Sequence, residues 1–146
     1  KNDHLQHLNI LEFVPELLKN LNQRKIYLGV VSNKNGDLLR EQVAYLKWDK
    51  WFSRIVGAND AKRDKPHRAP IDLVLEGSGI SAGKSVWFVG DAPSDMECAY
   101  NAGVSAVLLS GKANNQEIHT RYPPELTFHN ARELLRFLKQ TRGNRG

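Results

Sequence analysis

VWFVGDAPSD, residues 86–95, is the stretch of this sequence that decides the fold. Its four leading apolar residues predict a short buried strand, Val86–Val89, which ends at Gly90 and Asp91. Asp95 follows four residues after Asp91, in the first turn of a predicted helix. Two carboxylates at the carboxyl end of a strand can converge on a hard cation such as magnesium. In open α/β sheets, ligands bind at this edge.

Apolar segments of strand length alternate with amphipathic segments of helix length along the rest of the chain. We expect strands at residues 26–31, 53–57, 86–89, 104–109 and 126–128, and helices at 14–21, 37–46, 70–77, 96–102 and 131–139. The polar residues 32–36 are expected to form a loop, and Asp37 to cap the helix that follows. Apolar strands separated by helices are typical of a parallel sheet covered on both faces. The sequence therefore predicts a Rossmann-like α/β fold.

The 146 residues fit one domain, and a composition of 40% hydrophobic and 25% charged residues is sufficient for a core. We divide the chain into an irregular lead-in at residues 1–13, an α/β core at 14–140 and a disordered tail at 141–146. The single cysteine, Cys98, excludes an internal disulfide and is expected to be a small core residue.

The charge and hydropathy patterns bear on location and partners. No apolar run approaches the roughly 20 residues of a membrane helix, and together with the lone cysteine this favours a cytoplasmic protein. The net charge of +5 owes much to five basic residues after residue 131. No nucleic-acid recognition motif accompanies that charge. A phosphorylated small molecule is therefore the expected partner, and neither a membrane nor a nucleic acid is expected.

GSGISAGKS, residues 77–85, looks like a nucleotide-binding P-loop but does not fit that motif. The P-loop pattern requires glycine where Ser78 stands. A P-loop also leaves a strand and enters a helix, whereas here a predicted helix precedes the segment and a predicted strand follows it. We interpret these residues as a helix stop and a turn.

Three separated signals now occur in a characteristic order. An apolar strand leads into Ser32-Asn33, Lys65-Pro66 follows a short strand and loop, and Gly90-Asp91 precedes Asp95. This ordered set resembles motifs two, three and four of the haloacid dehalogenase superfamily, most closely its phosphoglycolate-phosphatase-like members. The resemblance covers residues 14–109.

The resemblance implies a role for each matching residue. Ser32 would donate a hydrogen bond to a substrate phosphate, with Asn33 adding polarity beside it, and Lys65 would offset negative charge as phosphate and nucleophile approach. Asp91 would bind Mg²⁺, and Asp95 would ligate it or hold one of its waters. The residues alone leave plainer interpretations open: a turn serine, a surface lysine, and an acid that is favoured at a helix start.

The first motif of the family has no counterpart in this sequence. In the family, a D-x-D-x-T pattern after an amino-terminal strand supplies the nucleophile that forms an aspartyl-phosphate, and a second aspartate acts as acid and base. Asp3 is the only aspartate before Asp37, and no strand precedes it. The small helical cap that usually follows the first motif is also absent.

The missing strand is central in the family, between the strands at 26–31 and 86–89. Unpaired buried backbone groups cost about 1–3 kcal/mol each, against a typical domain stability of roughly 5–15 kcal/mol. We therefore hypothesise that this is the carboxyl-terminal part of a longer protein, or that a second chain completes the sheet. Direct pairing of the two flanking strands is the alternative.

The resemblance leads to two functional hypotheses. The first is a Mg²⁺-dependent phosphatase of a small phosphorylated metabolite, inactive as this chain alone because the nucleophile is absent. The second is a non-catalytic phosphate-binding or interaction module that kept the fold. A D-x-D pattern after an apolar run, encoded upstream of Lys1, would favour the enzyme.

Overall fold

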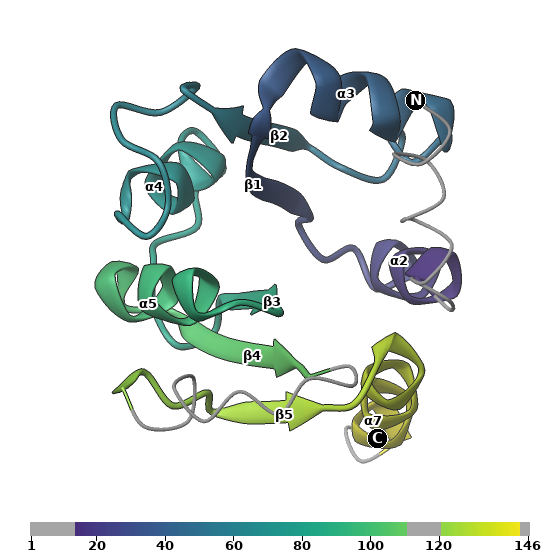
Figure 1. Ribbon diagram of the computed structural model, residues 1–146. Coiled ribbons are helices and arrows are strands. Elements are labelled where there is room, and N and C mark those ends of the chain that lie inside the picture. The colour runs from purple at the N-terminus through teal and green to yellow at the C-terminus, as the bar shows by residue number, and fades with distance from the viewer. Residues whose placement is uncertain (1–13, 111–120, 144–146) are drawn as a thin grey trace.

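The computed structural model describes residues 14–110 and 121–143, so the predicted lead-in at 1–13 lies outside the described residues. Helices and strands alternate in it as the sequence predicts (Figure 1). In chain order the elements are α2 (Val14–Gln23), β1 (Gly29–Asn35), α3 (Gly36–Tyr45), β2 (Arg54–Ala58), α4 (Ala69–Leu75), β3 (Trp87–Gly90), α5 (Pro93–Ala102), β4 (Ser105–Leu109), β5 (Leu126–Phe128) and α7 (Ala131–Gly143).

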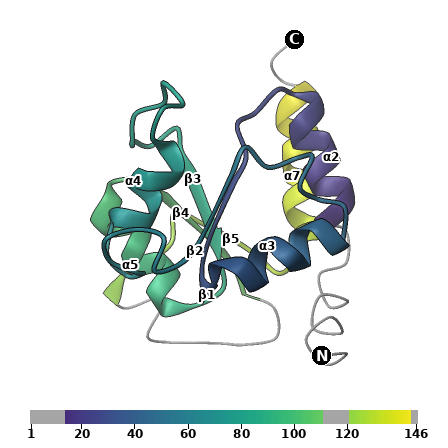
Figure 2. The same ribbon diagram turned by 90° about the horizontal axis from the view of Figure 1, so that it is seen from above.

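The described strands form two parallel sheets, one of β1 and β2 and the other in the order β3-β4-β5. In the first sheet Val30 pairs with Ile55, and in the second Phe88 pairs with Ala106. Helices α4 and α5 lie on one side of the strands, and α2, α3 and α7 on the other (Figure 2). The predicted parallel α/β architecture with helices on both faces is confirmed.

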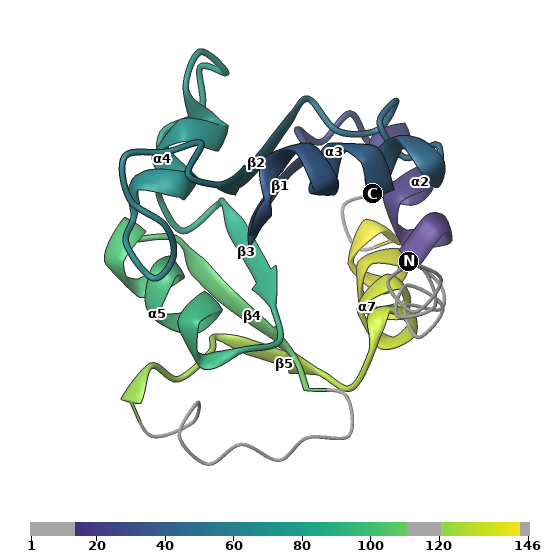
Figure 3. The same cartoon turned by 45° about the horizontal axis from the view of Figure 1, so that its top comes forward.

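Strands β1 and β3 are not paired with each other in the part of the chain that the structure describes. They form the facing edges of the two sheets, and no described strand lies between them (Figure 3). The alternative of direct pairing between these strands is therefore wrong. Among the described residues, the edge of each strand is open at the position where the family resemblance places a further strand.

The prediction of a buried strand at 86–89 is also wrong, because β3 spans Trp87–Gly90 and is partly exposed. Trp87 and Val89 are 38% and 39% exposed. Side chains alternate between the two faces of a strand, and Phe88 packs on the core beside α5. Trp87, on the other face, meets Phe137 of α7 at a ring-centroid distance of 6.4 Å. Because β3 is an edge strand, this contact covers its outer face only in part.

The first strand begins and ends later than predicted. Ile26 is 44% exposed and precedes β1, whereas residues 32–35, expected in a loop, belong to the strand. Pairing with β2 extends β1, since Asn35 lies opposite Ala58 after an irregularity in the register. Asn35, not Asp37, caps α3, and its side-chain oxygen accepts the N–H of Leu38 at 3.1 Å.

Several helix boundaries also differ from the predictions. Helix α5 begins at Pro93 instead of residue 96, because proline fits the first helical turn, and Gly103 closes it with a φ of 74°. Helix α7 runs to Gly143, so the first three residues of the predicted disordered tail are helical. Although α7 is the longest described helix at 13 residues, none of the described helices is long and apolar enough to cross a bilayer.

Two apolar clusters hold these elements together. One lies between α4, α5 and β4 and contains Ile71, Met96, Cys98, Ala99, Ala102, Val104, Ala106 and Leu108. The other joins α2 to α7 through Leu17, Ala131, Leu134 and Leu135. Cys98 is fully buried, as predicted for a small core residue. The first cluster supports the end of β3, where the candidate site begins.

Gly57 brings β2 against the start of α3 so closely that no side chain fits. A Cβ at this position would lie 2.4 Å from the Gly36 Cα and 2.8 Å from the Lys34 carbonyl oxygen. Because these are backbone atoms, we expect Gly57→Ala to lower the free energy of unfolding by about 1–3 kcal/mol, measured by urea denaturation. Gly83→Ala is the control, since its Cβ meets nothing closer than 4.0 Å. Equal stability of the two variants would contradict this packing.

Candidate functional site

The predicted site residues come from four segments of the chain. Ser32 and Asn33 occupy the carboxyl-terminal part of β1, and Asp91 follows the end of β3. Lys65 lies on the loop between β2 and α4, and Asp95 in the first turn of α5. The structure joins Asn33, Lys65 and Asp95 by direct contacts.

The centre of the site is an ion pair between Lys65 and Asp95. The Lys65 Nζ contacts Oδ1 of Asp95, and the two side chains are only 12% and 7% exposed. The same ammonium lies 5.9 Å from the ring centroid of Phe88, within cation–π range. A buried cation needs such partners. The Lys65 ammonium is therefore fixed by its partners and largely removed from solvent, so Lys65 is not a surface lysine.

The other oxygen of Asp95 organises the backbone after β3. Oδ2 accepts the N–H of Asp91 at 3.1 Å and the N–H of Ala92 at 3.2 Å. A carboxylate at this position also interacts favourably with the amino terminus of α5. Asp95 thus does what the plainer interpretation expected of a helix-start acid, and it holds Lys65 as well.

Gly90 makes the close approach of Asp95 possible. A Cβ at Gly90 would lie 2.4 Å from the Cβ and from Oδ2 of Asp95. Any side chain at this position would therefore displace the carboxylate.

Asp91 differs from Asp95 in its surroundings. Its residue is exposed, and in the described part of the chain no hydrogen bond or ion pair engages its carboxylate. Carboxylate oxygens are the ligands that Mg²⁺ prefers, so Asp91 fits the role of a metal ligand. Asp95 lies beside it, but both of its oxygens already have partners. The described residues contain no cluster of three His, Cys, Asp or Glu side chains that could hold a metal.

Ser32 and Asn33 differ in what the structure leaves available. Ser32 Oγ accepts the N–H of Lys34 at 3.1 Å, and no described residue accepts its hydroxyl hydrogen. Asn33 is engaged: its Nδ2 donates to the carbonyl of Lys65 at 3.2 Å, and its Oδ1 accepts the N–H of Lys65 at 3.1 Å. The site therefore has a serine hydroxyl that is able to donate to an anion. It also has an asparagine bound to the loop between β2 and α4 that carries Lys65, which we call the lysine loop.

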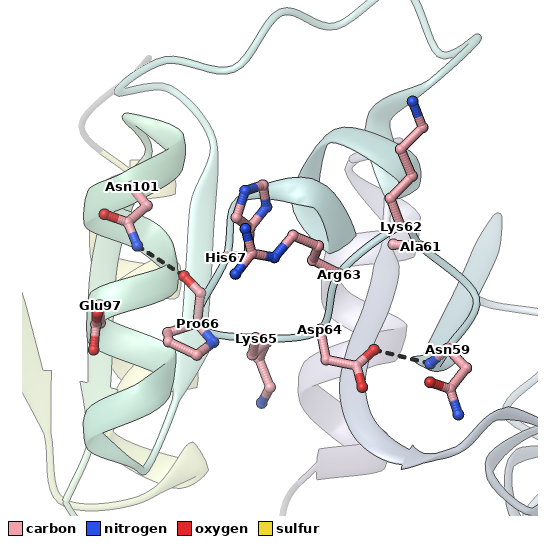
Figure 4. Close-up of a pocket in the computed structure, with 10 residues that line it drawn as sticks. All are labelled: Asn59, Ala61, Lys62, Arg63, Asp64, Lys65, Pro66, His67, Glu97 and Asn101. Atoms are coloured by element: carbon pink, nitrogen blue, oxygen red, sulfur yellow. Dashed lines mark hydrogen bonds between the residues drawn. The ribbon is translucent and has the colours of Figure 1, made fainter.

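A cavity of about 600 Å³ opens beside the lysine loop. Its lining includes Lys62, Arg63 and His67 from the loop, and Glu97 and Asn101 from α5 (Figure 4). His67 is held within its own loop, because its Nδ1 accepts the N–H of Ala69 at 3.0 Å. The cavity thus brings basic side chains next to the backbone that carries Lys65.

The sequence profile of a family described as haloacid dehalogenase-like hydrolase matches residues 1–109. This chain belongs to that family. The phosphoglycolate phosphatase of Escherichia coli K12 is 32% identical over 122 residues, which are 84% of this chain and 48% of that protein. The chain therefore spans about half the length of this curated relative.

Solved structures of the family have the same fold. A haloacid dehalogenase superfamily hydrolase from Ehrlichia chaffeensis superposes with a TM-score of 0.76 and 29% identity, over 88% of this chain and 57% of that protein. A protein from Haemophilus somnus 129PT, described as a predicted phosphoglycolate phosphatase, gives a TM-score of 0.77 and 28% identity, over 87% and 56% of the two chains.

Two contributors to this haloacid dehalogenase-like site were not predicted as such. Cys98 and Asn101 of α5 bind the backbone of the lysine loop through Sγ and Nδ2. A signal for them was present, because residues three and six positions after Asp95 project from one face of a helix. The signal was missed because Cys98 was interpreted only as a small core residue and Asn101 was not considered.

Proposed function

We propose that this chain provides the phosphate- and metal-binding side of a Mg²⁺-dependent phosphatase of small phosphorylated metabolites. The observation that carries the proposal is the desolvated ammonium of Lys65, paired with Asp95 at the sheet edge that also bears Ser32 and the free Asp91. A fixed positive charge and a hydroxyl donor suit a phosphate dianion. The similarity to a phosphoglycolate phosphatase supports the same chemistry.

The proposal assigns a role to each of four residues, and Asp95 has two. Ser32 donates its hydroxyl hydrogen to a phosphate oxygen, and Lys65 balances the charge of the phosphate against that of the approaching nucleophile. Asp91 would be the first protein ligand of Mg²⁺, with Asp95 ligating the ion or one of its waters. Bound Mg²⁺ would supply further neutralisation of the phosphate oxygens. Asp95 meanwhile keeps Lys65 and the Asp91 backbone in place.

The nucleophile of the proposed reaction would be an aspartate that is absent from this chain. Its carboxylate oxygen forms a bond to phosphorus, the ester P–O bond breaks, and a second aspartate protonates the departing alcohol. Water then attacks the aspartyl-phosphate, and phosphate and the free carboxylate are released. Both acids would come from one added strand.

The open edges of β1 and β3 support the proposal of an added strand. Each presents unpaired backbone groups within the described chain, and Val89 is 39% exposed beside one of them. A strand inserted there would form hydrogen bonds with the unpaired backbone groups of β1 and β3 and would reduce the exposure of Val89. We propose that it comes from sequence that precedes Lys1 or from a second chain.

The test of this function compares Asp91→Asn with Asp49→Asn. Both variants are made in a protein that carries, in addition to this chain, any residues that the gene encodes before Lys1. We expect Mg²⁺-dependent hydrolysis of p-nitrophenyl phosphate, with kcat/KM reduced about 10²-fold by Asp91→Asn, because a carboxylate ligand is lost. Asp49 is exposed on a loop between α3 and β2, so Asp49→Asn should match the wild type.

Equal rates for Asp91→Asn and the wild type would contradict the metal-binding role. Absence of hydrolysis, together with absence of a D-x-D pattern upstream, would contradict the enzyme and leave the phosphate-binding module. In that case, binding of inorganic phosphate measured by calorimetry should depend on Lys65 and Ser32.

A further inference from the structure

Three side chains from two elements hold the backbone of residues 65–67. Asn33 of β1 binds both the N–H and the carbonyl of Lys65. From α5, Asn101 Nδ2 donates to the Pro66 carbonyl at 2.8 Å, and Cys98 Sγ donates to the His67 carbonyl at 3.2 Å. Three consecutive carbonyls are thus each bound by a different side chain.

The spacing on α5 matches the loop residue by residue. Asp95, Cys98 and Asn101 are three positions apart and so lie along one face of the helix. Asp95 binds the ammonium of Lys65, and the two residues further along bind the loop backbone beyond it. Figure 4 shows Asn101 reaching from α5 to the Pro66 carbonyl beside Glu97. The loop is therefore fixed to the same helix that carries the partner of Lys65.

Cys98 can act in this arrangement only as a hydrogen-bond donor. Its residue is 0% exposed, and burial raises the pKa of its thiol to about 12. The thiol is therefore protonated at neutral pH, and it is neither exposed nor ionised as a reactive cysteine would be. Asn33 likewise spends its Nδ2 and its Oδ1 on Lys65.

We propose that Asn33, Cys98 and Asn101 are positioning residues that form a clamp on residues 65–67 and thereby place the Lys65 ammonium. In this assignment Asn33 acts through Lys65 and not by contact with substrate. The kinetic part of the proposal rests on the proposed phosphatase function, whereas its structural part does not. The two parts are therefore tested by separate measurements on the full-length protein.

The structural measurement is amide hydrogen exchange at Lys65 and His67, followed by NMR. Asn33→Ala removes the acceptor of the Lys65 N–H, so we expect exchange at Lys65 to become about tenfold faster. Asn22→Ala, which removes an exposed amide side chain from α2, should leave it unchanged. Unchanged exchange at Lys65 in Asn33→Ala would overturn the clamp whether or not the protein is a phosphatase.

Cys98 offers a matched pair of substitutions. Cys98→Ser keeps a donor for the His67 carbonyl, whereas Cys98→Ala removes it with little change in size. We expect Cys98→Ala to accelerate exchange at His67 several-fold, and Cys98→Ser to restore most of the protection. If the two variants exchange equally, Cys98 serves only for packing and is not part of the clamp.

The kinetic measurement is a double-mutant cycle with Lys65→Met. Asn33→Ala and Asn101→Ala should each lower kcat about five- to tenfold in the wild-type background, because the ammonium is misplaced. In the Lys65→Met background neither should lower it further, since the group that they position is gone. If the loss of kcat in the double variant is instead the product of the two single losses, Asn33 or Asn101 contacts substrate, and the assignment is overturned. Should the wild type lack activity, the proposed function fails and the exchange results alone decide the clamp.

Discussion

Lys65→Met is expected both to destabilise the fold and to cause a large but measurable loss of phosphatase activity. The substitution keeps most of the side-chain volume but removes the cation that pairs with Asp95, a carboxylate only 7% exposed. Breaking a buried ion pair by removing one partner costs about 3–5 kcal/mol, because the other charge stays buried without compensation. Urea denaturation should therefore show a clearly lower midpoint. Hydrolysis by the full-length protein should fall about 10³-fold.

A second substitution separates the lost charge from lost packing. Asn in place of Asp95 retains an oxygen for the N–H groups of Asp91 and Ala92 but carries no charge. We therefore expect Lys65→Met/Asp95→Asn to recover at least half of the lost stability without recovering activity. Lys19→Met, on an exposed position of α2, is the surface control. Lys65→Met as stable as Lys19→Met would show that the ion pair does not hold the site together.

Where tertiary contacts did not change the outcome, the local sequence pattern predicted the secondary structure correctly. Residues 126–128 form β5 as predicted, and the glycine-rich segment at 77–85 is the expected turn between α4 and β3. Gly77 and Gly79 there have φ values of 76° and 81°, which suit glycine in turns and not a phosphate-binding helix start.

The errors in the fold prediction come from tertiary contacts. The polar composition of residues 32–35 indicated a loop, but pairing with β2 extends the strand through them. Trp87 and Val89 indicated burial, yet β3 is an edge strand whose outer face is only partly covered. Both outcomes depend on which neighbours a strand acquires, and local sequence does not encode this.

The sequence indicated candidate residues for the site but not the contacts between them. Ser32, Asn33, Lys65, Asp91 and Asp95 became candidates because their ordered motifs resemble those of the haloacid dehalogenase superfamily. Which carboxylate would hold the lysine depends on the trajectory of the loop after β2, and the same holds for the binding of Asn33 to Lys65. These are contacts across about thirty residues of sequence, so only the folded chain shows them.

Gly90→Ala is expected to be the most damaging glycine substitution in the site. Its Cβ would lie 2.4 Å from the Cβ of Asp95, so either β3 or the first turn of α5 must move. Movement of Asp95 would weaken its bonds to the Asp91 and Ala92 N–H groups and its contact with Lys65. Overpacking and lost buried hydrogen bonds together predict a loss of about 2–4 kcal/mol in the free energy of unfolding.

Repeating Gly90→Ala in an Asp95→Gly background tests whether the contact with Asp95 causes the loss of stability. The three nearest atoms to a Cβ at Gly90 all belong to the side chain of Asp95, so Asp95→Gly removes every one of them. In the Asp95→Gly background, Gly90→Ala should therefore cost less than about 1 kcal/mol, although Asp95→Gly is itself destabilising. Equal costs in both backgrounds would mean that Gly90 is required for another reason. A reduced cost would establish that glycine after β3 is needed to admit the carboxylate that holds Lys65.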